Sequence, residues 1–216
     1  MKRLTTCVVL LWIAGCGSAA IKENTDAQDA STPGKEAAPA QTEAELDKAI
    51  VDSSEAIRLD PTDPLAYFNR GRAYDSRGAY YKANLGSSGR QKQQDDYNKA
   101  VADFTEAIQL NPDYAGAYRH RGNAHYYESE HDKAIADFSE AIRIEPENPA
   151  SYYSRGVKYS RLGKYKRAVT DFSEAIRLET TNPLVYLLRG YVYHEQGEAE
   201  KAKADFEVAH SMGLVR

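Results

Sequence analysis

Residues 118–141, with the sequence YRHRGNAHYYESEHDKAIADFSEA, decide the fold of this chain. The first half of the stretch places an aromatic residue, a glycine and a histidine at positions i, i+4 and i+7: Tyr118, Gly122 and His125. The second half places two alanines and a phenylalanine at the same spacing: Ala134, Phe138 and Ala141. Residues so spaced share one face of an α-helix. Their small members let a partner helix come close, so the stretch predicts two packed helices with axes about 8–10 Å apart.

The same pattern recurs along the chain. Gly122, Gly156 and Gly190 are 34 residues apart, and Gly71 precedes Gly122 by 51 residues, which is one period plus 17. An arginine stands directly before each of these glycines. A fixed period of this size is typical of a solenoid of helical hairpins rather than of one globular core.

Each copy begins with an aromatic residue, Arg-Gly and a second aromatic residue or histidine, and ends with the Ala, Phe and Ala positions. This pattern resembles the tetratricopeptide repeat. The resemblance covers about residues 43–216 and implies an all-α, right-handed superhelical solenoid of antiparallel helix pairs. The expected parts are an N-terminal half-repeat helix at 43–63 and four repeats at 64–114, 115–148, 149–182 and 183–216. Asp63-Pro64, Asn148-Pro149 and Asn182-Pro183 each place an N-cap residue before a proline, which predicts helix starts.

The first repeat carries the 17 extra residues, between Gly78 and Tyr97. Gly86-Ser87-Ser88-Gly89 is a turn signal, and both flanks are good helix formers. We therefore expect both helices of this repeat to run about two turns longer than in the other repeats. Gly78, Gly163 and Gly197 are expected at the hairpin turns. The protruding tip would offer Tyr80, Tyr81 and Arg90 for contact; the alternative is a tolerated insertion without a role.

The N-terminus predicts a targeting segment. Lys2 and Arg3 precede a short apolar stretch, too short for a membrane span, which favours a secretory signal at 1–15. Ile13-Ala14-Gly15-Cys16 resembles the bacterial lipobox, which implies cleavage before Cys16 and lipidation of its sulfur. Residues 16–42 lack aromatic side chains and predict a flexible linker after the lipidated cysteine. The alternatives are an ordinary signal peptide or an uncleaved anchor, with Cys16 a bystander.

The composition argues against a nucleic-acid partner and against an internal disulfide. The chain of 216 residues has 28 Lys+Arg against 32 Asp+Glu, a net charge of −4, whereas nucleic-acid binding normally needs a basic excess. Cys7 and Cys16 are the only cysteines. Cys7 would leave with the signal, so the mature chain could form no internal disulfide.

The sequence indicates no catalytic site, metal site or cofactor. The five histidines show no metal-ligand spacing. An aspartate recurs in every copy, at Asp103, Asp137, Asp171 and Asp205. An active site is normally single, so residues present four times are expected to be structural, and we suggest that these aspartates pair with the recurring arginines.

Residues that vary between the copies are better candidates for a binding site. In the tetratricopeptide-repeat family, the first helices of the repeats line a concave groove. The resemblance places these residues in the groove: Phe68, Arg72, Arg119, Asn123, Tyr127, Tyr153, Val157, Leu187 and Tyr191. They change from basic and polar to apolar along the chain, which suits a peptide with an acidic end and an apolar end. The alternative is that many of them pack between neighbouring repeats.

These observations predict a protein- or peptide-binding adaptor. The resemblance to small bacterial lipoproteins of this family implies a lipid anchor in a cell envelope, and Gly17 after the cysteine favours the outer membrane at its periplasmic face. The alternatives are a homo-oligomer built through the C-terminal end, where no long capping helix follows the last repeat, and an assembly factor for a pilus or for the outer membrane. An enzyme is the hypothesis that the residues support least.

Overall fold

The computed structural model describes residues 42–127, 130–178 and 181–214. These residues form helices without any strand. The helices are α2 (Glu43–Leu59), α3 (Pro64–Leu85), the short 3₁₀ helix η1 (Gly86–Gly89), α4 (Arg90–Leu110), α5 (Ala115–Tyr127), α6 (His131–Ile144), α7 (Pro149–Arg161), α8 (Tyr165–Arg177), α9 (Pro183–Glu195) and α10 (Ala199–Ser211). The expected signal segment, Cys16 and nearly all of the linker lie outside the described residues.

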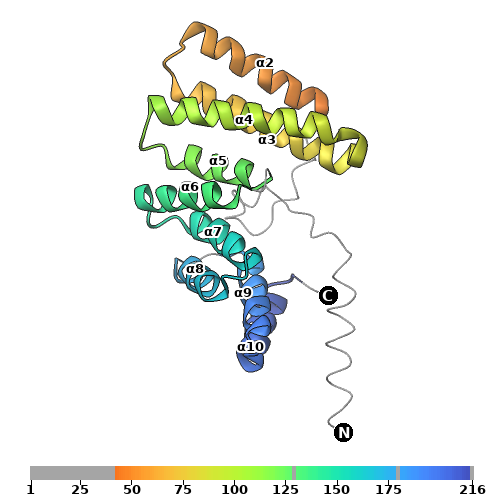
Figure 1. Ribbon diagram of the computed structural model, residues 1–216, viewed down its shortest axis with the longest axis vertical. Coiled ribbons are helices and arrows are strands. Elements are labelled where there is room, and N and C mark those ends of the chain that lie inside the picture. The colour runs from red at the N-terminus through yellow and green to blue at the C-terminus, as the bar shows by residue number, and fades with distance from the viewer. Residues whose placement is uncertain (1–41, 128–129, 179–180, 215–216) are drawn as a thin grey trace. The chain divides into compact units, whose positions relative to one another are not determined.

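The helices form a solenoid of antiparallel pairs (Figure 1). The pairs are α3–α4, α5–α6, α7–α8 and α9–α10, and the second helix of each pair also contacts the first helix of the next. Helix α2 packs on α3 and so completes the N-terminal end of the described stack. The all-α solenoid fold expected from the sequence is confirmed.

Helix starts follow the capping residues. The side chains of Asp63, Asn148 and Asn182 accept hydrogen bonds from backbone amides two residues on, and a proline occupies the first turn of α3, α7 and α9. Thr42 begins α2 with a capping box, in which its hydroxyl accepts from the Glu45 amide while the Glu45 carboxylate accepts from the Thr42 amide. Each cap satisfies a backbone donor that has no partner within the helix.

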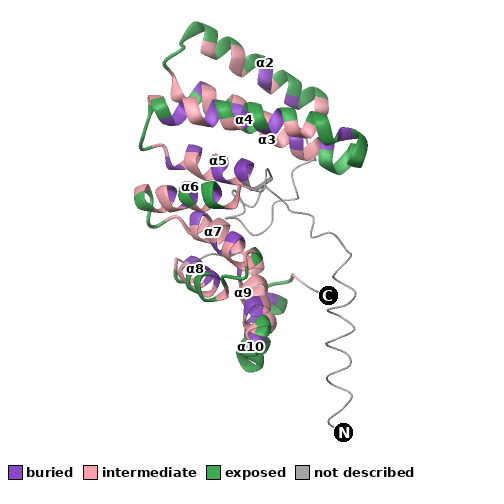
Figure 2. Cartoon of the chain, viewed as in Figure 1, coloured by how far each residue is buried: buried purple, intermediate pink, exposed green. Residues whose placement is uncertain are grey.

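A glycine and an aromatic ring form the core of each pair. Phe104, Phe138 and Phe172 are 0% exposed, and buried residues line the inner faces of the pairs (Figure 2). A Cβ atom added at Gly156 would lie 2.9 Å from the Phe172 ring. Alanine at this position would therefore force the two helices apart.

The recurring arginines and aspartates form a ladder of ion pairs. In every repeat the arginine binds the aspartate through two parallel hydrogen bonds, as Arg155 does with Asp171 at 2.9 Å for both Nε–Oδ2 and Nη2–Oδ1. The equivalent pairs are Arg70–Asp103, Arg121–Asp137 and Arg189–Asp205. The suggested pairing of these residues is confirmed.

The same arginines also connect neighbouring repeats. Arg155 Nη1 donates to the hydroxyl of Ser139 on α6, at 3.0 Å. The other hydroxyls in this role are those of Ser54, Thr105 and Ser173. Each guanidinium thus joins its own pair of helices and the second helix of the preceding repeat, which fixes the stacking of the repeats.

The first pair is longer because its core pattern is repeated. Helices α3 and α4 have 22 and 21 residues, against 13 each for α7 and α8. Seven residues beyond Arg70-Gly71, Arg77 binds Asp96 at 2.7 Å, and a Cβ atom at Gly78 would lie 2.8 Å from the Tyr97 ring. The expected extension by about two turns is confirmed, but the prediction that Gly78 lies in the turn is wrong. Gly163 and Gly197 do lie in turns, with φ of 66° and 77°.

The extension of α3 also holds α2. Arg77 donates to Asp47 of α2 as well as to Asp96 of α4, and the Tyr81 hydroxyl donates to Glu43 Oε1 at 2.8 Å. Tyr81 is consequently buried and does not offer a contact at the tip, contrary to the sequence-based expectation. Arg90 is exposed there and Tyr80 is half-buried.

Candidate ligand groove

The first helices of the repeats lie next to one another along one side of the stack. In the described part of the chain, α3 contacts α5, α5 contacts α7 and α7 contacts α9, whereas α4, α6, α8 and α10 make no such contacts among themselves. Because the first helices are the closer-packed set, the stack curves towards them and they line its concave side. We call this surface the groove.

The residues predicted for the groove lie on these helices. Each helix carries two of them four residues apart: Phe68 and Arg72 on α3, Arg119 and Asn123 on α5, Tyr153 and Val157 on α7, and Leu187 and Tyr191 on α9. Arg72 is exposed and the other seven are half-buried. The side chain of Tyr127, at the end of α5, lies outside the described residues.

The N-terminal end of the groove is built on a cluster of rings. The Phe68 ring lies 4.7 Å from Tyr114, 5.3 Å from His120 and 5.9 Å from Phe104, measured between centroids. Phe68 therefore fills the junction between the first two repeats as well as facing the groove. Arg72 extends over it, with its guanidinium carbon 5.9 Å from the ring centroid.

Beside this cluster, α5 buries two polar side chains without partners. Arg119 Nη1 is buried and has no hydrogen-bond partner, and the same holds for Nδ1 of His120, which is 8% exposed. Burial lowers the pKa of Arg119 to about 10, with Glu145 opposing the change and Arg72 adding to it. Burial, reinforced by Arg119 and Arg72, lowers the pKa of His120 to about 3, so this imidazole is neutral near pH 7.

This arrangement favours a negatively charged ligand group. A buried donor without an acceptor costs about 1–3 kcal/mol, and the cost is larger for a charged group. A carboxylate reaching Arg119 would supply the missing acceptor and would also lie near the exposed Arg72. The sequence placed Arg119 in the groove, but only the structure shows that its Nη1 is unsatisfied and that the neighbouring His120 shares this property.

The C-terminal end of the groove is apolar. Tyr153 and Val157 pack against the core around Phe172, with the Tyr153 and Phe172 rings 6.4 Å apart. The Tyr191 ring makes an edge contact with Phe206 at 5.3 Å. These half-buried rings are held by packing, which leaves them suited to contact with apolar side chains of a ligand.

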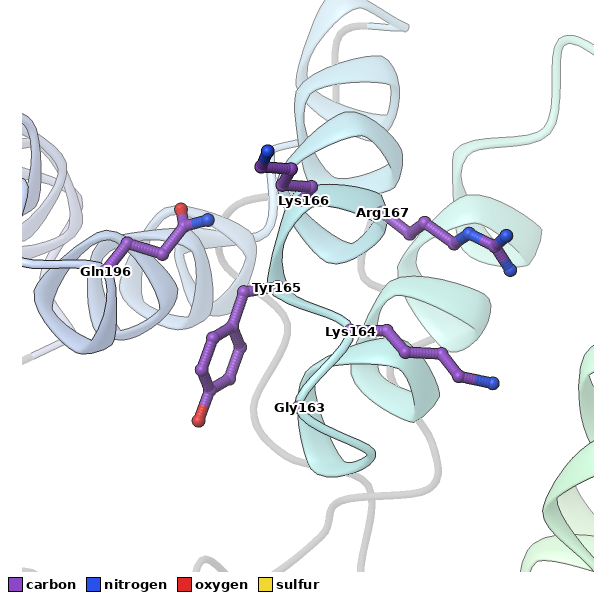
Figure 3. Close-up of a pocket in the computed structure, with 6 residues that line it drawn as sticks. All are labelled: Gly163, Lys164, Tyr165, Lys166, Arg167 and Gln196. Carbon is purple, nitrogen blue, oxygen red and sulfur yellow. The ribbon is translucent and has the colours of Figure 1, made fainter.

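One depression outside the groove, among the described residues, does not form a converging site. It has a volume of about 600 Å³ and lies at the turn between α7 and α8, lined by Gly163, Lys164, Tyr165, Lys166, Arg167 and Gln196. Figure 3 shows that Lys164 and Arg167 extend to the same side of the turn, whereas Lys166 points away from them. They do not surround a common point at which an anion could bind.

Within the described ranges, no group of three or more His, Cys, Asp or Glu residues is placed to hold a metal ion. His125 Nδ1 lies 2.8 Å from Glu130 Oε2 in an aromatic position of the core, which is a structural role. Among the described helices none has the length and apolar character needed to cross a bilayer.

Comparison with known families finds the repeat directly. A family model described as TPR repeat matches residues 91–127, 122–163 and 158–197, and one described as tetratricopeptide repeat matches 54–102. Together they span residues 54–197, about two thirds of the chain. No curated protein sequence matches the chain significantly.

Solved structures share the fold. A crystal structure of MamA has a TM-score of 0.64 at 21% identity, covering 78% of this chain and 89% of that one. MamA from Desulfovibrio magneticus RS-1, residue 41 to the end, has a TM-score of 0.62 at 18% identity, covering 78% and 85%. YrrB, a TPR protein described as having an unusual peptide-binding site, has a TM-score of 0.59 at 19% identity, covering 77% of each chain. At these identities the likeness shows the fold alone.

Proposed function

Because the chain belongs to the tetratricopeptide-repeat family, we propose that it is a protein-interaction scaffold whose groove binds an extended segment of a partner protein. Proteins of this family are typically scaffolds without catalytic activity. The observation that carries the proposal is the unsatisfied Nη1 of Arg119, beside the exposed Arg72, at one end of a groove whose other end is apolar.

The chemistry of the groove defines the ligand. A segment with an acidic side chain at the Arg72 and Arg119 end and apolar side chains along α7 and α9 complements both ends. An acidic group there gains a charge-assisted hydrogen bond from Arg119 and long-range attraction from Arg72. Tyr153 and Tyr191 supply rigid rings for the apolar part. The structural neighbour YrrB is described as a TPR protein with an unusual peptide-binding site, which is a precedent for peptide binding on this fold.

Position-specific crosslinking in cells tests the groove. A photoreactive residue replaces Val157 in the groove and, as the matched control, Lys203 on the exposed face of α10. We expect a protein adduct from position 157 that is weak or absent from position 203, and mass spectrometry then identifies the partner. Equal amounts of adduct from both positions would show that the partner contacts the surface generally and does not bind in the groove.

The location proposed for this scaffold is a bacterial envelope. The support is the lipobox-like Ile13-Ala14-Gly15-Cys16, which implies a lipid anchor, and Gly17, which favours the outer membrane at its periplasmic face. A Cys16→Ala chain should lose incorporation of labelled fatty acid, and the share of the protein in the membrane fraction should fall. If the variant stays wholly in that fraction, the anchor at Cys16 is refuted; density separation of the two membranes tests the outer-membrane assignment.

A second candidate is a structural homo-oligomer, which could also act as an assembly factor for an envelope machine such as a pilus. It is favoured by one observation: Val208 on α10 and Met212, which directly follows this helix, are both exposed. Light scattering at high concentration should then show a dimer or larger species that Val208→Lys abolishes. A monomer at every concentration contradicts this candidate and leaves the groove proposal intact.

A further inference from the structure

The extended end of the first pair projects beyond the rest of the stack. We call residues 80–92, which comprise the end of α3, η1 and the start of α4, the tip. Helix α3 has 22 residues against 13 in α5, and at 1.5 Å per residue the tip lies about 13 Å farther along the helix axis than the later turns. Figure 1 shows this end of α3 and α4 reaching past α5 and α6. A flat surface can therefore meet the tip without meeting the other turns.

The tip is positively charged on an acidic protein. It contains Lys82, Arg90 and Lys92 and no Asp or Glu, whereas the whole chain has a net charge of −4. All three cations are exposed. Near the tip, Glu43 accepts a hydrogen bond from the Tyr81 hydroxyl and Asp95 accepts one from the Gln91 amide.

Apolar and aromatic groups lie among these charges. Leu85 is 40% exposed at the end of α3, and Tyr80 is half-buried one turn before it. The Lys92 ammonium lies 5.0 Å from the centroid of the buried Tyr81 ring. Long cationic side chains around an exposed leucine and a tyrosine are suited to a lipid–water interface, where charged ends meet headgroups and apolar parts lie deeper.

The tip is an ordered surface. Asn84 Nδ2 donates to the Tyr80 carbonyl at 2.9 Å, and the Ser88 hydroxyl donates to the Leu85 carbonyl at 2.7 Å. Tyr81 anchors the tip to the first residue of α2. The chain thus enters α2 beside the tip, so an anchor N-terminal to α2 would be joined to the solenoid at this end.

We propose that the tip binds the surface of an anionic lipid bilayer. Lys82, Arg90 and Lys92 contact headgroup phosphates, and Leu85 inserts at the interface. The attraction does not need the lipid at Cys16, although an anchor raises the local concentration of the tip at the membrane. The groove residues of α3, Phe68 and Arg72, precede the tip, and the others lie on α5, α7 and α9, so the groove is left open for its own ligand.

Vesicle sedimentation of the full chain carrying Cys16→Ala tests the proposal without the lipid. The vesicles contain either phosphatidylcholine alone or phosphatidylcholine with about 30% phosphatidylglycerol. The tip variant is Lys82→Gln, Arg90→Gln and Lys92→Gln. The matched control removes three exposed cations from the α7–α8 turn, as Lys164→Gln, Lys166→Gln and Arg167→Gln. The apolar N-terminal stretch is present in every chain, so differences between variants report the substituted cations.

We expect stronger binding to the anionic vesicles, a loss of at least about tenfold in the tip variant and less than about twofold in the control. Leu85→Ser should weaken binding without changing its salt dependence. Equal losses in the tip and control variants, or equal binding to both vesicle types, would overturn the proposal.

If the tip binds an acidic protein instead, the tip variant keeps its vesicle binding and loses adducts from a photoreactive residue at Leu85. Arg119→Ala should leave vesicle binding unchanged, which separates this test from that of the groove.

Discussion

The first and third helix pairs are built from the same parts and differ in length. In α7–α8, Arg155-Gly156 meets Asp171-Phe172 once, and the helix ends at a turn in which Gly163 has φ of 66°. In α3–α4 the same contact occurs twice, seven residues apart, and Gly78 occupies the middle of a helix. Gly78 and Gly163 hold the same place in the repeat, seven residues after the core glycine. One makes room for the Tyr97 ring and the other permits a left-handed turn.

The comparison shows that a repeat can be lengthened without a loop. Because seven residues are close to two helical turns, adding a second Arg-Gly and Asp-aromatic set continues the same packed face. The longer pair then gains a partner in α2, through Arg77 and Tyr81. Four predictions test these contacts, and they are ordered from the largest expected change in the free energy of unfolding to the smallest.

The largest expected effect comes from removing one aspartate of the ladder. Asp171→Ala leaves the partly buried Arg155 without its carboxylate and should lower the free energy of unfolding by about 4 kcal/mol. Asp96→Ala should lower it by only about 2 kcal/mol, because Arg77 retains Asp47. Denaturant unfolding measures both values. Equal losses would show that the bond to α2 does not support Arg77.

Leucine substitutions should distinguish the two glycines. Gly78→Leu places side-chain atoms into the Tyr97 ring and should destabilise the protein by about 3 kcal/mol. A Cβ atom at Gly163 would meet no atom within 4 Å, so Gly163→Leu should cost about 1 kcal/mol, mainly because leucine must adopt a positive φ. Asparagine, which tolerates a positive φ, is the control and should be nearly neutral at position 163 only. If Gly78→Asn and Gly163→Asn change the free energy of unfolding equally little, the packing of Gly78 against the Tyr97 ring is contradicted.

The junction of the first two repeats should respond to mild acid through the buried His120. The pKa of His120 is lowered to about 3, while that of an unfolded histidine is about 6.5. As the pH falls below 6.5, the unfolded chain binds a proton that the folded chain excludes, so the free energy of unfolding decreases. Between pH 6.5 and 5, this effect should lower the free energy of unfolding of the wild type by about 2 kcal/mol. His120→Phe should abolish this loss. Identical pH profiles for the variant and the wild type would contradict the burial of a neutral imidazole.

The smallest effects concern the hydroxyls that join the repeats. Ser139→Ala should destabilise by about 1 kcal/mol, since its hydroxyl accepts from Arg155 at 3.0 Å. Ser54→Ala should cost less, because the equivalent bond to Arg70 measures 3.4 Å. A double-mutant cycle of Ser139 with Arg155 measures the coupling. Zero coupling would show that these hydroxyls do not stabilise the stacking of the repeats.

The sequence predicts the parts of this fold that depend on local periodicity. The helix starts at Pro64, Pro149 and Pro183, the ion pairs of the ladder and the lengthening of the first pair all follow from spacing and capping. The position of Gly78 did not follow, because a glycine followed by helix formers suits either a turn or a helix until the ring of Tyr97 is placed opposite it. The burial of Tyr81 depends on α2, a contact between distant segments that no local pattern specifies.

The candidate site was predictable in outline only. The repeat register placed Arg119 and Tyr153 on the first helices, where the structure has them. It did not reveal that Phe68 fills the junction between repeats, nor that Arg119 and His120 bury polar atoms without partners. Those properties arise from packing across the junction and require coordinates.

The central claim is that the recurring residues form the scaffold and the varying residues bind the partner. Its most direct test is to measure how tightly a double variant binds the partner identified by crosslinking. Arg119→Ala with Tyr153→Ala should weaken binding at least tenfold, which corresponds to about 1.4 kcal/mol, under conditions in which circular dichroism shows that the variant is folded. The control, Lys133→Ala with Arg143→Ala on the exposed face of α6, should bind as the wild type does. Unchanged affinity in a folded Arg119 and Tyr153 variant would contradict the claim.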